Sequence, residues 1–141
     1  MHELLDASAV TLARWIRQRK LSPVELLEAL IDRIADVNPA INAVIAERYT
    51  LALAEARAAE HRAMHEPADT LPPLLGLPYT AKEYIRATGM PLSAGIWSRR
   101  HVRSDRDAET VARLGRAGAI LVGITNVPEG GLWMETYHDV Y

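Results

Sequence analysis

Lys82 is the side chain whose type and position best suit chemistry in this sequence. Lys20 and Lys82 are the two lysines of the chain, and all other cationic side chains are arginines. Lys82 follows the largely apolar run 77–81, at the end of a predicted strand. A lysine there can extend into solvent or pair with Glu83 or Asp107, as charged side chains commonly do. Alternatively, apolar neighbours can desolvate it, and a neutral amine is a general base near neutral pH, which arginine cannot be. Spacing and composition leave both interpretations open.

The histidines and glycines give no comparable pattern. His61 and His65 are four residues apart on a predicted helix and share one face, but no third metal ligand accompanies them. A solvated helix face is the commoner explanation of such a pair. The chain has no cysteine, which excludes disulfides and thiolate chemistry. It also lacks the glycine motifs of dinucleotide and phosphate loops. We therefore predict no metal and no cofactor.

The composition is that of a globular protein of one domain. The 141 residues are 49% hydrophobic and 24% charged, with a formal net charge of −2. Such a balance disfavours intrinsic disorder, and it disfavours a dedicated nucleic-acid binder, which carries a basic excess. No apolar run reaches the roughly 20 residues of a membrane-spanning helix, so we expect no integral membrane segment. Acidic residues stand where a secretory signal has basic ones, and we expect a cytoplasmic protein.

The first half, residues 1–66, is predicted to be helical. Ser8 is an N-cap candidate, and Ser22 with Glu25 forms a capping box around a proline at the first helical position. The second helix is expected to end at Asn38 and Pro39. A short extended segment should then cover 41–46, followed by a third helix from Arg48 to about Met64.

The second half, residues 74–141, is predicted to contain a βαβ unit. The expected strand 77–81 is followed by an irregular loop over 88–106. Asp107 is the expected N-cap of a helix that Gly118 stops. The continuous apolar run 119–125 predicts a strand buried on both faces. Strand, helix and strand in this order imply a parallel pair with a right-handed connection.

Taken together, three segments of the chain resemble the amidase signature family. Residues 21–44 are similar to its opening helix pair, and residues 76–83 (GLPYTAKE) to the strand that carries its catalytic lysine. Residues 107–129 match its helix, strand and Thr-Asn-x-Pro-Glu turn. Glu83, where many members have Asp, and Ile96, where many have Ser, are more like the fatty-acid-amide-hydrolase branch than the tRNA-amidating branch. The resemblance implies an α/β fold whose mixed sheet core is flanked by helices, with residues 1–141 forming the N-terminal part of a single domain.

The resemblance also implies a reaction. The family hydrolyses carboxylic amides by a Ser–cis-Ser–Lys relay, which makes Lys82 the base. Gly131, Trp133 and Met134 either line an acyl pocket or pack in the ordinary way. Asn126 and Glu129 are expected to fix the turn by hydrogen bonds.

Both serines of the relay are expected beyond Tyr141. The chain thus resembles an N-terminal fragment that is inactive alone. In the complete enzyme the expected partner is a small-molecule amide, and a homodimer is one of the assemblies left open. One alternative is the A subunit of a tRNA-dependent amidotransferase. Another is a non-catalytic helical interaction module formed by residues 1–66.

Overall fold

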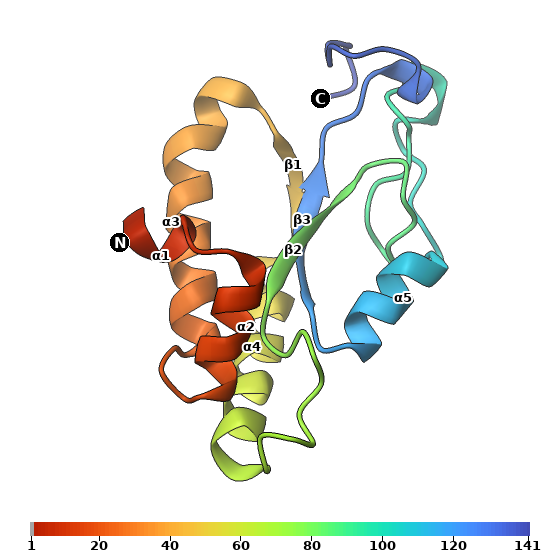
Figure 1. Ribbon diagram of the computed structural model, residues 1–141. Coiled ribbons are helices and arrows are strands. Elements are labelled where there is room, and N and C mark those ends of the chain that lie inside the picture. Colours follow the sequence, from red (N-terminus) through yellow and green to blue (C-terminus); the bar gives the residue numbers. More distant parts are fainter. Residues whose placement is uncertain (1) are drawn as a thin grey trace.

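The computed structural model describes residues 2–141 as a small mixed sheet between helices (Figure 1). The helices of this part of the chain are α1 (His2–Leu5), α2 (Ala9–Arg17), α3 (Pro23–Ile41), α4 (Tyr49–His65) and α5 (Glu109–Arg116). The strands are β1 (Val44–Glu47), β2 (Pro78–Lys82) and β3 (Ile120–Thr125), and two 3-10 turns are η1 (Trp97–Arg99) and η2 (Glu129–Gly131).

Strand β3 is the centre of the sheet, whose order is β1-β3-β2. β2 pairs with β3 in parallel, which confirms the predicted βαβ unit, and β1 pairs with β3 antiparallel. Lys82 at the end of β2 stands opposite Thr125 at the end of β3. The two parallel strands thus end side by side, at the edge where α/β folds commonly bind ligands.

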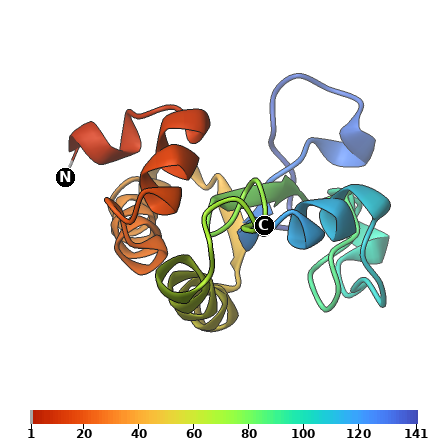
Figure 2. The same ribbon diagram turned by 60° about the horizontal axis from the view of Figure 1, so that its bottom comes forward.

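Helices cover both faces of β3, which explains why its sequence is apolar without alternation. Ile120 and Val122 pack with Leu27 of α3 and with α4. Leu121 and Ile124 pack on the opposite side, in the cluster that contains Val111 of α5. Figures 1 and 2 show α3 and α4 on one side of the strands and α5 on the other. The expectation of a strand buried on both faces is confirmed, since Ile120–Ile124 are all buried.

Small side chains let α4 lie close to its neighbours. Its buried face consists of Ala52, Ala56, Ala59 and Ala63, spaced by three or four residues as one helix face requires. The first two pack beneath β3 with α3, and the last two join the cluster around α2. Helices α3 and α4 are therefore part of the core that holds β3, which argues against a separate helical module formed by this half of the chain.

The two predicted serine caps are confirmed. The Ser8 hydroxyl accepts a hydrogen bond from the Thr11 N–H. The Ser22 hydroxyl accepts from the Val24 and Glu25 N–H groups, while the Glu25 carboxylate accepts from the Ser22 N–H. Such caps are local, because each partner lies within three residues.

The predicted end of α3 at Asn38 and Pro39 is wrong. The helix continues through Pro39 to Ile41 and ends with Asn42 in the left-handed region, at φ 46°. The reason is a tertiary tie: the Asn38 side chain donates to the Val44 carbonyl and accepts from the Val44 N–H, both at 2.8 Å. This pair of hydrogen bonds to the start of β1 offsets the helical hydrogen bond that proline cannot make.

The predicted N-cap of α5 is also wrong. Ala108 occupies that position and makes no side-chain cap. The Asp107 carboxylate instead accepts from the Thr88 N–H (2.7 Å) and the Thr88 hydroxyl (2.8 Å), which closes the loop 88–106 at its base. These bonds hold the pKa of Asp107 below its usual value. Asp107 thus accepts two hydrogen bonds from Thr88 and none from the first turn of α5.

We expect Ser22→Ala to lower the free energy of unfolding by about 1 kcal/mol, the usual effect of losing an N-cap. The Ser22 hydroxyl also donates to Glu60 on α4, so its loss weakens the contact between α3 and α4. Urea unfolding followed by circular dichroism measures the change. The control is Ser98→Ala on the exposed turn η1, which should leave stability unchanged. Equal stability of the two variants would contradict the cap assignment.

Within residues 2–141, no helix has the length and apolar character that crossing a membrane requires.

Candidate functional site

Lys82 lies at the carboxyl end of β2, with its side chain exposed. Its Nζ donates a hydrogen bond to the Asn126 carbonyl at 3.0 Å. The ion pairs of residues 2–141 do not include Lys82, so it pairs with neither Glu83 nor Asp107. The apolar surroundings that one interpretation of the sequence requires are not formed by this part of the chain. The amine is instead held by a backbone carbonyl of the neighbouring strand end.

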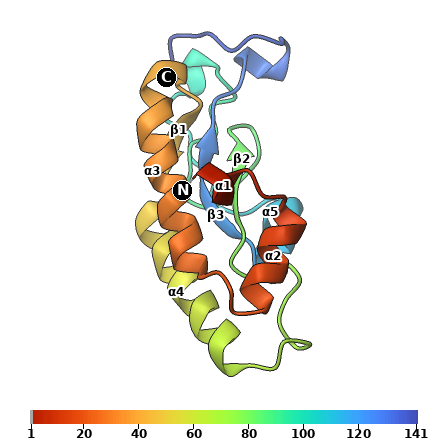
Figure 3. The same ribbon diagram turned by 60° about the vertical axis from the view of Figure 1, so that its left-hand side comes forward.

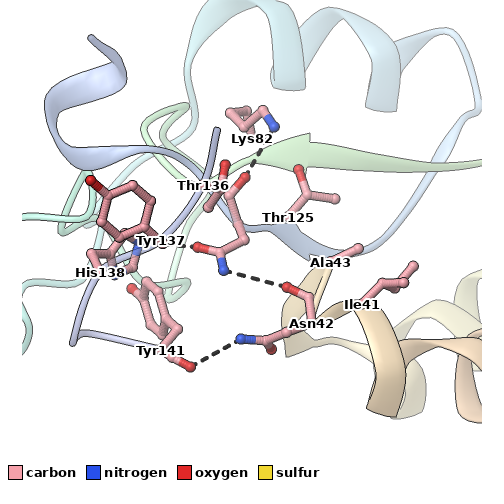
Figure 4. A pocket seen from close by; sticks show the side chains of 10 residues that line it. Ile41, Asn42, Ala43, Lys82, Thr125, Thr136, Tyr137, His138 and Tyr141 are labelled. Atoms are coloured by element: carbon pink, nitrogen blue, oxygen red, sulfur yellow. Dashed lines mark hydrogen bonds between the residues drawn. The ribbon is translucent and has the colours of Figure 1, made fainter. Parts of the chain in front are cut away.

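A cavity of about 500 Å³ opens beside this amine (Figure 4). Its walls come from the end of α3, from the ends of β2 and β3, and from the C-terminal segment. The lining residues are 41–43, Lys82, 125–126, 136–138 and Tyr141. Figure 3 shows the C-terminus beside the end of α3, where the Asn42 side chain donates to the Tyr141 carbonyl at 3.0 Å. Segments far apart in the sequence therefore meet around Lys82.

Asn126 organises the turn that follows β3. Its side-chain oxygen accepts from the Val127 N–H at 3.0 Å, and its own N–H donates to the Ala43 carbonyl at 2.8 Å. These contacts agree with the predicted role of Asn126 in fixing the turn. Glu129, the other residue given that role, is exposed, and its carbonyl accepts from the Leu132 N–H at 3.2 Å.

His138 joins the site from the C-terminal segment. Its Nε2 lies 3.1 Å from the Asn126 side-chain oxygen and 2.9 Å from the Val127 carbonyl. Both neighbours are acceptors, so Nε2 carries the proton and donates, while Nδ1 accepts from the Val140 N–H at 3.1 Å. In the sequence this histidine is isolated, and no spacing rule connects it to a residue 12 positions earlier.

The sequence did not indicate that Glu83 would be buried beside this site. Its side chain is 0% exposed, although carboxylates are rarely buried without a cation. One of its oxygens accepts from the Ser93 N–H and from the Tyr141 hydroxyl (2.6 Å), and the other accepts from the Ala94 N–H (2.6 Å). The sequence did contain one signal, the charged residues at 82 and 83. Successive side chains of a strand point to opposite faces, so one of two consecutive charged side chains is expected to point inward.

Tyr141 is held as a hydrogen-bond donor to this carboxylate. Burial, followed by the hydrogen bond to Glu83, raises the pKa of Tyr141 to about 12. The phenol therefore keeps its proton at physiological pH. Because that proton goes to Glu83, the Ser93 hydroxyl, 3.2 Å from the Tyr141 oxygen, donates to it.

The other predicted site residues are not brought to this cavity. Gly131 ends η2, and Trp133 and Met134 follow it with exposed fractions of 69% and 98%. The cavity beside Lys82 is not lined by any of the three. Their role in an acyl pocket stays a prediction. His61 and His65 lie stacked on an exposed face of α4, with ring centroids 4.2 Å apart.

Comparison with known proteins decides the family. A sequence profile of the family described as Amidase matches residues 25–141. The chain belongs to the amidase family. Members of this family are hydrolases of carboxylic amides, and the α/β fold with a mixed sheet expected from the sequence is the fold that these enzymes share.

Individual amidases of known sequence or structure match most of the chain. Fatty-acid amide hydrolase 2-A of Danio rerio is 44% identical over 98% of this chain, which spans 27% of the relative. The A subunit of a glutamyl-tRNA(Gln) amidotransferase from Azoarcus is 39% identical over 89% of this chain and 25% of its own length. A solved fatty acid amide hydrolase superposes on 99% of this chain and 24% of its own with a TM-score of 0.89 at 22% identity, which shows a common fold. The chain thus spans about a quarter of the amidases it matches.

Proposed function

We propose that this chain is the N-terminal quarter of an amidase that hydrolyses carboxylic C–N amide bonds, with Lys82 as the general base. The observation that supports it is the Lys82 amine, placed at the end of a parallel strand beside a cavity of about 500 Å³. The family match over residues 25–141 includes this lysine. Cavities at the carboxyl ends of parallel strands are common sites of catalysis in α/β folds.

The proposed chemistry is a proton relay in the complete enzyme. Lys82, as a neutral amine, takes a proton from a bridging serine, which takes one from the nucleophilic serine. That serine attacks the amide carbonyl, the relay returns a proton to the leaving amine, and water hydrolyses the acyl-enzyme. The Asn126 carbonyl would accept one N–H of Lys82, which orients the amine and leaves its lone pair free to face the cavity.

A fatty-acid amide is the proposed substrate class. It rests on the 44% identity to a protein named fatty-acid amide hydrolase. Trp133 and Met134, exposed in this part of the chain, would supply apolar surface for an acyl chain. The test is hydrolysis of a long-chain primary amide against acetamide by the full-length protein. Faster turnover of the long chain supports the proposal, and a preference for acetamide contradicts the substrate class.

A second candidate is the A subunit of an amidotransferase, favoured by the 39% identity to such a protein. That activity would deliver ammonia to a partner protein instead of releasing it. Co-purification with partner subunits and ATP-dependent amidation of a charged tRNA distinguish it from a free-standing amidase.

We expect no amidase activity from the 141-residue chain alone. A lysine base without its serines has no hydroxyl to activate, and members of a catalytic unit lose nearly all their effect when one is missing. The assay is release of the free amine from a small aryl amide, with the Lys82→Ala chain as the blank. Turnover above that blank would reveal another nucleophile within residues 1–141 and would contradict the relay.

A further inference from the structure

The Glu83 carboxylate holds the loop 93–95 in an unusual conformation. Ala94 has φ +54° and Gly95 has φ +70°, and residues with a side chain rarely adopt such angles. The N–H groups of Ser93 and Ala94 both donate to the buried carboxylate. Hydrogen bonds to a charged acceptor are stronger than neutral ones, so these two offset the strain of the turn.

This loop in turn supports the segment after β3. The Ala94 carbonyl accepts from the Gly130 N–H at 2.7 Å. Gly95 is packed so closely that an added Cβ would lie 3.0 Å from the Glu129 Cα and 3.0 Å from the His138 ring. The position of the loop therefore determines where Glu129, Gly130 and His138 can lie.

The contacts then lead back to Lys82. His138 donates to the Asn126 side chain and to the Val127 carbonyl. The Asn126 carbonyl accepts from Lys82 Nζ. The Glu83 N–H also donates to the Thr125 carbonyl at 3.0 Å, which continues the strand pairing by one residue past Lys82. This series of contacts thus connects Glu83 to Lys82, the residue that precedes it in the chain.

We propose that Glu83 is a positioning residue for Lys82, acting through the loop 93–95 and His138 to hold the Asn126 carbonyl that binds the amine. The proposal deepens the proposed function and rests on it, since the position of Lys82 matters for catalysis only if Lys82 is the base. Glu83 is buried whereas Lys82 is exposed, and Glu83 does not line the cavity. Its effect on the amine is therefore indirect.

The test is Glu83→Gln in the 141-residue chain, observed by ¹⁵N NMR. Glutamine offers one acceptor oxygen and turns an NH₂ group towards the remaining donors. We expect the Ser93 and Ala94 amide protons to exchange about tenfold faster, as loss of bonds to a charged group predicts. The Lys82 ζ-ammonium protons should likewise exchange about tenfold faster, because their acceptor is no longer held in place. Lys20, the other lysine, should not change, and Lys20→Arg assigns the two signals.

Matched variants separate positioning from loss of stability. Glu83→Asp keeps the charge and should restore part of the Lys82 protection. Ser22→Ala lowers stability far from the site and should leave the Lys82 signal unchanged. If Glu83→Gln does not fold, Tyr141→Phe, which removes one donor to Glu83, should shift the Lys82 signal in the same direction.

An unchanged Lys82 signal in a folded Glu83→Gln or Tyr141→Phe chain overturns the proposal. Retained protection of Ser93 and Ala94 in Glu83→Gln overturns it as well. A separate experiment tests the proposed function: normal turnover by Lys82→Arg in the full-length protein would contradict it. The two failures are therefore distinguishable.

Discussion

Replacing Lys82 by arginine in the full-length amidase is expected to lower kcat by about 10³-fold or more, within the range that a general base contributes. Arginine preserves the positive charge and can still donate to the Asn126 carbonyl, but it does not release its proton near neutral pH. Lys82→Ala should lose a similar amount, because both variants lack a base. Steady-state hydrolysis of an aryl amide measures the effect.

Lys20→Arg is the matched control for this substitution. Lys20 is exposed between α2 and α3, and the same change of side chain there should leave kcat unaltered. Near-normal turnover by Lys82→Arg would show that the amine is a charge or a hydrogen-bond donor instead of a base. A loss confined to KM would point to substrate binding.

Gly123→Ala is expected to lower the free energy of unfolding by about 3 kcal/mol, at the upper end of what overpacking usually costs. A Cβ at Gly123, in the middle of β3, would lie 2.6 Å from the Ala46 carbonyl oxygen and 3.2 Å from the Val44 side chain. The carbonyl belongs to the backbone of β1, so it cannot move without disturbing the pairing of β1 with β3. Urea denaturation with linear extrapolation measures the change.

Gly115→Ala is the matched control, and it is expected to raise the free energy of unfolding where Gly123→Ala lowers it. Gly115 lies in α5, and an added Cβ meets nothing within 4 Å. Alanine in a helix interior is more stable than glycine by up to about 1 kcal/mol, so this variant should gain stability. A Gly123→Ala chain as stable as the wild type would mean that β1 does not pair closely with β3.

Local sequence determined the features whose partners lie within a few residues. The caps at Ser8 and Ser22 were predictable, because a hydroxyl reaches N–H groups two or three positions onward. The apolar run of β3 predicted burial on both faces, and the order of strand, helix and strand predicted its parallel pairing with β2. The three segments 21–44, 76–83 and 107–129, taken together, indicated the family.

Tertiary structure decided the features whose partners are remote in the chain. The Asn38 side chain hydrogen-bonds Val44, and α3 continues past Asn38 as a result. Asp107 does not cap α5, because its carboxylate accepts a hydrogen bond from Thr88, 19 residues away. Val44–Glu47 joins the sheet because β3 offers it an edge, and no local rule names that partner.

The surroundings of Lys82 also depend on residues that are remote in the sequence. Glu83 is buried because its carboxylate meets the backbone of the loop 93–95 and a phenol 58 residues further along. A buried charge is stable only where donors converge on it, and folding alone brings donors from separate segments together. The sequence therefore predicted a base at Lys82, while the tertiary structure showed which residues surround it.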